Sequence, residues 1–307
     1  RGLIVFRQDR TNPSTAVSTW KARKDLPRAN PSTAISAWMN GGLAGGSVFN
    51  AYGGLITQYE DSGTTYRVHA FRSAGKFTIT DGSADVDLLI VAGGGGGGRA
   101  AGGAGGVRSF TSANQITVEA ASSPYTITVG TGGLNGYWSS VPQAADGTST
   151  SALGMSATGG GKGGMYTGSS YNQGGNGGSG GGSYYSGSGG SGNAGSYSPV
   201  EGYDGGSSSS QAGGGADSSP TGDNGGSGRV VFGIGSGTQV VGGGGSGNGS
   251  GGGGGSVTGG GGPYVTDSMG RGGVPNTGGG SGGRAGASSA ERHSGGAGLV
   301  LIRYVVA

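Results

Sequence analysis

Three aspartates, Asp81, Asp85 and Asp87, lie close together and are the first side chains that suggest chemistry. Clustered carboxylates supply the oxygen ligands that Ca²⁺ takes in proteins. Because side chains two positions apart share one face of a strand, Asp85 and Asp87 would point the same way. A solvated strand edge also carries charged side chains of this kind, and we favour that interpretation. We therefore expect no metal site.

The chain contains fragments of a catalytic and a nucleotide-binding motif, and neither has the context it needs. Residues 177–181 match Gly-x-Ser-x-Gly, but a nucleophile elbow also needs a strand, a helix and a nearby histidine. The two histidines, His69 and His293, stand in no triad context. The strand-then-glycine stretch 91–98 resembles a dinucleotide-binding turn, yet the residues after it cannot form the helix that would hold a phosphate. We expect no enzyme activity and no cofactor.

Aromatic side chains recur through the glycine-rich part of the chain. Tyrosine and tryptophan present large rigid faces with a polar tip, which suits stacking on the sugars of a surface polysaccharide. The same rings could instead fill space between glycine segments, and the sequence leaves both roles open. The adjacent pair Tyr184 and Tyr185 favours contact with a ligand. The candidate receptor-binding residues are Tyr137, Trp138, Tyr166, Tyr171, Tyr184, Tyr185, Tyr197 and Tyr203.

Glycine accounts for 84 of the 307 residues, and only 10 of these precede Ala92. Such a composition normally indicates disorder, because glycine loses much backbone entropy on folding and few apolar groups offset that loss. Collagen would need glycine at every third position and abundant proline, but the chain has 9 prolines and irregular glycine runs. An ordered alternative is a bundle of polyglycine-II helices, with three residues per turn and main-chain hydrogen bonds between segments.

Composition also excludes several classes of protein. The chain has no cysteine, which rules out disulfides and thiolate metal sites. No apolar run approaches the roughly 18 residues of a membrane span, so we expect no membrane insertion. The basic stretch 21–24 lacks interleaved aromatic residues, so we interpret it as a solvated link and expect no nucleic-acid partner. The chain begins with Arg1 rather than Met, which is typical of a processed or trimmed product.

The first 60 residues differ from the rest and predict an anchoring or assembly segment. Residues 1–30 carry seven Lys or Arg against two Asp. Residues 11–20 and 29–38 are near copies that share Asn-Pro-Ser-Thr-Ala, an aliphatic residue, a serine and a tryptophan. A repeated aliphatic–tryptophan pair suits docking onto a repeating surface such as a neighbouring subunit. The candidate assembly residues are Leu3, Ile4, Val5, Phe6, Val17, Trp20, Ile35 and Trp38.

Short apolar runs predict the rest of the architecture. Period-two alternation from Thr64 and a buried apolar run at 86–92 indicate strands. Strands are predicted at 64–71, 77–79, 86–92, 106–110, 115–119, 125–129, 229–234, 239–241 and 298–305. Their spacing predicts an all-β fold, with a sandwich or barrel-like frame of short strands and a large glycine-rich insert of packed polyglycine-II helices. We divide the chain into 1–60 and a glycine-rich β domain at 64–307, with the insert at about 130–298 and a linker over 41–63.

Five segments in a fixed order carry a resemblance to a known family. They are Val68–Ile79, Val86–Gly98, Gly102–Val107, Tyr125–Gly133 and the closing strand Gly295–Tyr304. Together they resemble the glycine-rich domain of bacteriophage tail-fibre and appendage proteins, over about residues 64–305. The resemblance implies polyglycine-II packing, with host recognition in loops at one end. It does not extend to residues 1–60.

The sequence therefore predicts a virion structural protein, a tail-fibre or appendage adhesin subunit that binds a host-surface glycan or protein non-covalently. Its other expected partners are copies of itself and further virion proteins contacted through residues 1–60. The alternative is an extracellular, pilus-like filament subunit, in which Arg1–Phe6 would add as a strand to a neighbour. Ice binding would need regular ranks of Thr or Ser, which the sequence lacks.

Overall fold

The computed structural model describes residues 49–136, 143–166, 172–207, 210–247, 260–262, 272–283 and 293–306. The chain divides into two compact units, Arg1–Ser47 and Val48–Ala307. All of the described residues belong to the second unit.

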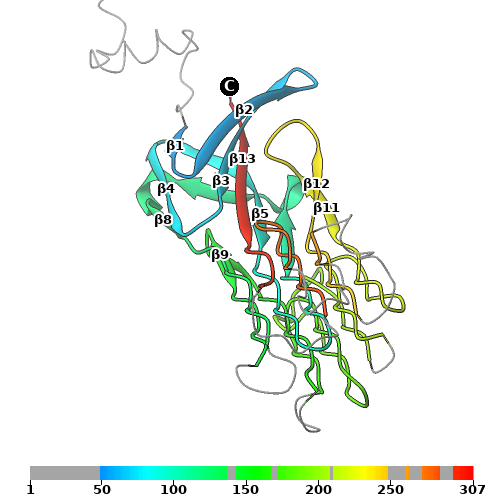
Figure 1. Ribbon diagram of the computed structural model, residues 1–307. Helices are drawn as coiled ribbons and strands as arrows, with labels where there is room; N and C mark the ends of the chain where they lie inside the picture. The colour runs from blue at the N-terminus through cyan, green and yellow to red at the C-terminus, as the bar shows by residue number, and fades with distance from the viewer. Residues whose placement is uncertain are drawn as a thin grey trace, which may run out of the picture. The chain divides into compact units, whose positions relative to one another are not determined.

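The described residues form short β-strands joined by turns and extended glycine-rich segments (Figure 1), so the predicted all-β class is confirmed. The strands are β1 (Asn50–Tyr52), β2 (Leu55–Asp61), β3 (Thr64–Phe71), β4 (Gly75–Asp81), β5 (Ser83–Val91), β6 (Val107–Phe110), β7 (Ile116–Glu119), β8 (Tyr125–Ile127), β9 (Thr150–Ala152), β10 (Met155–Ala157), β11 (Arg229–Phe232), β12 (Thr238–Val241) and β13 (Leu299–Val305). Two 3₁₀ turns, η1 (Ser112–Asn114) and η2 (Ala120–Ser122), flank β7. Within the described ranges, no helix is long and apolar enough to cross a membrane.

The frame is built on an antiparallel sheet with the order β2-β3-β13-β5-β6, in which β7 also pairs with β5. The last strand of the chain, β13, lies between β3 and β5 (Figure 1). Its residue Leu301 is opposite Ala70 on one side and Leu89 on the other. The sheet therefore forms only when the last strand of the second unit, β13, inserts between strands from its first part, β3 and β5.

Both faces of this sheet are buried, which explains the continuous apolar run in β5. On one face, Leu88, Ile90 and Ile302 pack with Phe77 of β4 and Ile127 of β8, which belong to a second sheet of order β1-β4-β8. The other face packs against a hairpin. There Leu89, Val91 and Leu301 contact Phe232 of β11 and Val241 of β12. The frame is thus layered like a sandwich, as predicted.

One ion pair is embedded in the sheet. Asp87 and Arg303 are opposite each other on β5 and β13, and the Arg303 Nε and Nη2 donate to Asp87 Oδ2 at 2.8 and 2.5 Å. Gln115 Nε2 donates to the other carboxylate oxygen at 2.9 Å. Burial acts to lower the pKa of Arg303, but the bonds to Tyr59 and Asp87 outweigh it and the pKa is raised. Arg303 is therefore held charged, and both carboxylate oxygens of Asp87 accept hydrogen bonds.

The glycine-rich segments form a bundle that continues from the ends of the frame strands (Figure 1). Along residues 93–96, three successive N–H groups donate to three different neighbouring segments. The fourth N–H group donates to the same segment as the first. The pairs in order are Gly93 to Thr148, Gly94 to Gly296, Gly95 to Gly103 and Gly96 to Ala145. This three-residue period is the one that a helix with three residues per turn requires. The polyglycine-II conformation itself stays a prediction.

At many of its glycines the bundle packs too closely to admit a side chain. A Cβ atom added at Gly95 would lie 2.1 Å from the carbonyl oxygen of Gly161. The main chains consequently take the place of a side-chain core, and their N–H and C=O groups bond to one another. This packing explains why the insert can be ordered with so little apolar side-chain area.

At segment 187–193, side chains supply acceptors that a neighbouring main chain would otherwise provide. Gln173 Oε1 accepts from Ser188 N–H and Asn176 Oδ1 accepts from Ser191 N–H, both at 2.8 Å. The two acceptor residues are three positions apart in the sequence, and so are the two donor residues. These bonds therefore follow the three-residue period of the bundle. Polar side chains thus complete the hydrogen bonding of this segment.

Two expectations about the extent of the frame need correction. Strands β1 and β2 fall inside residues 41–63, which we expected to be a linker. The hairpin β9–β10 lies inside the predicted insert. In the first case β2 is an edge strand with apolar residues on both faces, so its sequence shows no alternation. In the second, Thr150 is the one β-branched residue, and the other positions of the two strands carry Ser, Ala and Met.

Candidate binding surface

Three turns of the bundle bring aromatic side chains together at the end away from the frame. Tyr166 follows segment 158–165, and Tyr184 and Tyr185 lie in the turn before segment 187–193. The ring centroids of Tyr166 and Tyr184 are 5.7 Å apart, and those of Tyr184 and Tyr185 are 6.4 Å apart. The Arg99 guanidinium lies 5.1 Å from the centroid of the Tyr184 ring. We call these four residues the tip cluster.

The main chain holds the tip cluster in place. The turn at Arg99 is closed by a bond from Gly98 N–H to the Ala100 carbonyl, and Ala100 N–H donates to Gly164 next to the Tyr166 turn. Tyr184 N–H donates to the Asn172 carbonyl at 2.8 Å. These contacts tie separate turns to the same hydrogen-bonded bundle, so the rings are positioned by rigid segments.

The tip cluster presents aromatic area to solvent. Tyr185 is 73% exposed and Tyr166 is 53% exposed, while Tyr184 is half-buried between them. Tyr185 has a positive φ of 55°, a conformation that favours glycine, so the turn directs this side chain outward at some backbone cost. Exposed tyrosines beside a guanidinium can stack on a ligand and hydrogen-bond to it without any covalent step.

Two other predicted receptor-binding tyrosines lie near the frame instead. Tyr197 is packed: its hydroxyl is 2.8 Å from Ser156 Oγ and the Arg108 guanidinium lies 3.8 Å from its ring centroid. Tyr203 is 38% exposed and bonds through its main chain to Gly180 and Gly215. These contacts give Tyr197 a space-filling role and separate both residues from the tip cluster.

The remaining predicted residues lie outside the described ranges. They are Tyr137, Trp138, Tyr171 and all eight candidate assembly residues, Leu3, Ile4, Val5, Phe6, Val17, Trp20, Ile35 and Trp38. Their predicted roles stay predictions.

Two of the three aspartates that suggested chemistry make structural contacts. Asp87 pairs with Arg303, and Asp85 accepts a hydrogen bond from Thr117 Oγ1 at 2.6 Å. Ser179, the central residue of the Gly-x-Ser-x-Gly match, is fully buried inside the bundle. In the part of the chain that the structure describes, no group of three or more His, Cys, Asp or Glu could hold a metal ion.

His69 is a buried part of the frame core. Its Nδ1 lies 2.8 Å from the Gly53 carbonyl oxygen and its Nε2 lies 3.2 Å from the Tyr304 hydroxyl. Burial lowers its pKa, the bond to Gly53 opposes that shift, and the charge of Arg67 adds to it. The neutral imidazole therefore connects the β1–β2 turn to the central sheet through hydrogen bonds.

A second charged group, which the sequence did not single out, joins the bundle to the frame. Arg229 Nη1 donates to the Val107 carbonyl at 2.8 Å, and Nη2 donates to Val200 and Ala216. Glu201 is fully buried nearby, and its Oε2 accepts from Thr158 N–H at 2.8 Å. Burial lowers the pKa of Arg229, while Asp217, Tyr203 and Glu201 oppose that shift. Glu201 and Arg229 could have been noticed in the sequence, because charged residues are uncommon in the glycine-rich stretch and these two bond to distant segments.

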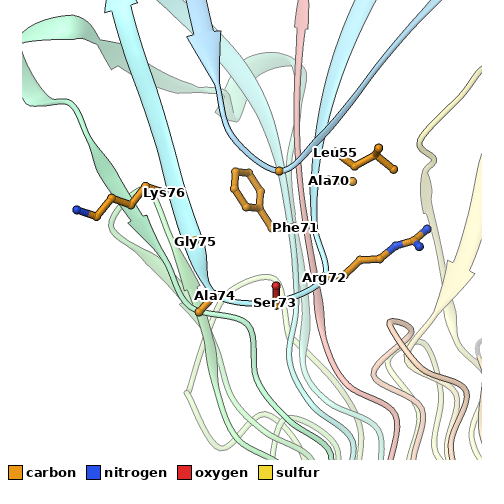
Figure 2. Close-up of a pocket in the computed structure, with 9 residues that line it drawn as sticks. Leu55, Ala70, Phe71, Arg72, Ser73, Ala74, Gly75 and Lys76 are labelled. Atoms are coloured by element: carbon orange, nitrogen blue, oxygen red, sulfur yellow. The ribbon is translucent and has the colours of Figure 1, made fainter.

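A cavity of about 410 Å³ lies between the start of β2 and the β3–β4 turn (Figure 2). Phe71 and Leu55 line it together with the turn residues Ser73 and Ala74. The charged ends of Arg72 and Lys76 point away from its centre, to opposite sides (Figure 2). Without convergent polar groups, the cavity lacks the features of a built ligand site.

A comparison with known protein families gives a match that spans both the frame and the bundle. A family model described as a glycine-rich domain matches residues 71–305, from the end of β3 to the last residue of β13. The search of curated proteins and the search of solved structures each gave no significant match. Because the family model covers well over half of the sequence, the chain belongs to the glycine-rich domain family.

Proposed function

We propose that the chain is a virion structural protein, a subunit of a tail fibre or appendage adhesin, that binds a host-cell surface non-covalently. The observation that carries the proposal is the tip cluster: exposed tyrosines from separate turns meet at one end of a rigid main-chain bundle. The ordered segments that resemble phage appendage proteins support the same interpretation. The ligand is a surface glycan or protein, and the binding involves no chemistry.

The geometry suits recognition of a repeated surface. Rigid tyrosines lose little conformational entropy on binding, and their rings stack on sugar faces while their hydroxyls hydrogen-bond. A bundle without side-chain freedom holds those rings in fixed positions. Copies of the chain in one particle would multiply weak individual contacts into firm attachment. In this proposal the chain is part of the virion, with other virion proteins as further partners.

The test removes the rings of the tip cluster. We expect the triple variant Tyr166→Ala, Tyr184→Ala, Tyr185→Ala to bind cells and purified surface polysaccharides of a susceptible host at least about tenfold more weakly, because each ring lost removes about 1 kcal/mol or more. The matched control is Tyr52→Ala, which removes an exposed frame tyrosine of 56% exposure. Thermal unfolding should be unchanged in both. Equal binding by the triple variant, or an equal loss with the control, would rule out the tip cluster.

A further inference from the structure

The outer edge of β2 is an unpaired strand edge in the described part of the chain. β2 is the first strand of the sheet order and pairs there only with β3, over all seven of its residues and without a bulge. It contains no proline and no lysine, two of the residues that commonly protect strand edges from pairing. Its acids, Glu60 and Asp61, are confined to the end next to the hairpin turn.

Apolar residues lie along the same edge. Leu55 is 53% exposed and Ile56 is 43% exposed, on opposite faces of the strand. Leu55, Thr57 and Tyr59 share one face, because their partners on β3 are Ala70, Val68 and Tyr66. An added strand would cover apolar area on both faces and satisfy the outward main-chain groups.

We infer that this edge pairs with β2 of a second copy of the chain, antiparallel and about a two-fold axis at Thr57. In that register Thr57 is opposite itself, Leu55 is opposite Tyr59 of the second copy, and Ile56 is opposite Gln58. The Leu55–Tyr59 pairs are aliphatic–aromatic, which is favourable across strands. The Thr57 hydroxyl is already donated to the Ile234 carbonyl of its own chain at 2.8 Å, so Thr57 contributes through its main chain and its methyl group. The interface is isologous, so it closes at two copies.

The charges disfavour the register that is shifted toward the hairpin turn. An axis at Gln58 would place Glu60 opposite Ile56 and Asp61 opposite Leu55, setting both acids against apolar side chains. With the axis at Thr57, the acids lie beyond the paired residues, beside Gly54 and Gly53. Strand pairing over five residues is small for a protein interface, so the dimer is weak and concentration-dependent.

The absence of natural cysteines makes the register directly testable by disulfide trapping. Directly opposed residues in antiparallel strands have Cα atoms about 4.5–5.5 Å apart, within the range that a disulfide spans. A mixture of Leu55→Cys and Tyr59→Cys chains should form a cross-linked heterodimer under mild oxidation. Either variant alone should form at least about tenfold less covalent dimer, because like residues are four positions apart in this register.

Two further measurements make the outcome decisive. Val230→Cys, at a β11 residue of 62% exposure, reports random collision between copies. The native chain should show a mass that rises toward that of a dimer with concentration, and Leu55→Lys should abolish the rise. Cross-linking of the mixture no faster than that of Val230→Cys, with a monomeric mass at all concentrations, would overturn the proposal. So would preferential cross-linking in another register.

Discussion

At the scale of single residues, polar groups in the frame act by fixing structure. His69 is fully buried and is held between the Gly53 carbonyl and the Tyr304 hydroxyl. It thereby connects the turn before β2 to the last strand of the chain. A neutral histidine in this position has a consequence for the pH dependence of stability, because the unfolded chain takes up a proton more readily than the folded one.

We expect the free energy of unfolding to fall as the pH falls below about 6.5, the pKa of histidine in the unfolded chain. The folded pKa of His69 is lowered by burial, whereas the unfolded value is near 6.5. Between the two pKa values the unfolded state binds more protons, so acid favours unfolding and stability is regained above about pH 6.5. Denaturant titrations of the native chain and of His69→Gln across this range measure the effect. The variant should lose most of the slope, and a retained slope would assign it to other groups.

At the scale of elements, the glycine segments depend on the absence of side chains more than on any side chain present. The interior of the bundle is main chain bonded to main chain, and the closest approaches leave no space for a methyl group. Glycine is therefore required by contact, in addition to its conformational freedom. A Gly→Ala substitution adds one carbon atom. Its effect on stability therefore shows whether a glycine is required by close packing or lies in an open turn.

Gly95→Ala should destabilise the chain by at least about 1–3 kcal/mol, the usual cost of overpacking, because its Cβ would lie 2.1 Å from the Gly161 carbonyl oxygen. Gly235→Ala is the matched control. It lies in the β11–β12 turn, where an added Cβ meets nothing within 4 Å, and should be neutral or slightly stabilising. Thermal unfolding of both variants distinguishes them. Similar melting temperatures would contradict side-chain exclusion at Gly95.

The frame could be predicted from the sequence because its strands carry readable patterns. The apolar run of β5 follows from its burial on both faces. Strand β3 could be recognised from its alternation, although residues 68–71 are also buried on both faces. The edge strand β2 could not be recognised, since Leu55 and Ile56 are both exposed and the run has no period of two.

The path of the bundle could not be predicted for a related reason. Glycine has no side chain, so nothing in the sequence records which segments are neighbours or in what register. Tyr166 and Tyr184 were recognisable one by one as candidate ligand contacts. Their meeting with Arg99 depends on hydrogen bonds between segments that are distant in the sequence, such as Ala100 N–H to the Gly164 carbonyl.

At the scale of the whole second unit, frame and bundle depend on each other. The frame strands β5, β6 and β13 continue directly into glycine segments, and β13 reaches the centre of the sheet only after the chain has passed through the bundle. The bundle in turn has almost no apolar core of its own, while the apolar clusters lie in the frame. The two should therefore unfold as one cooperative structure.

Leu301→Ala tests this coupling. Leu301 is fully buried in the frame sheet, and its truncation should cost about 2–5 kcal/mol. Amide hydrogen exchange under native conditions then compares the frame with Gly160 and Gly161, whose N–H groups bond to Gly93 and Ser179 inside the bundle. If the unit is cooperative, protection of these glycines falls by the same factor as that of the slowest frame amides. Unchanged protection in the bundle would mean that main-chain packing alone keeps it folded, and that the frame serves only to direct the segments.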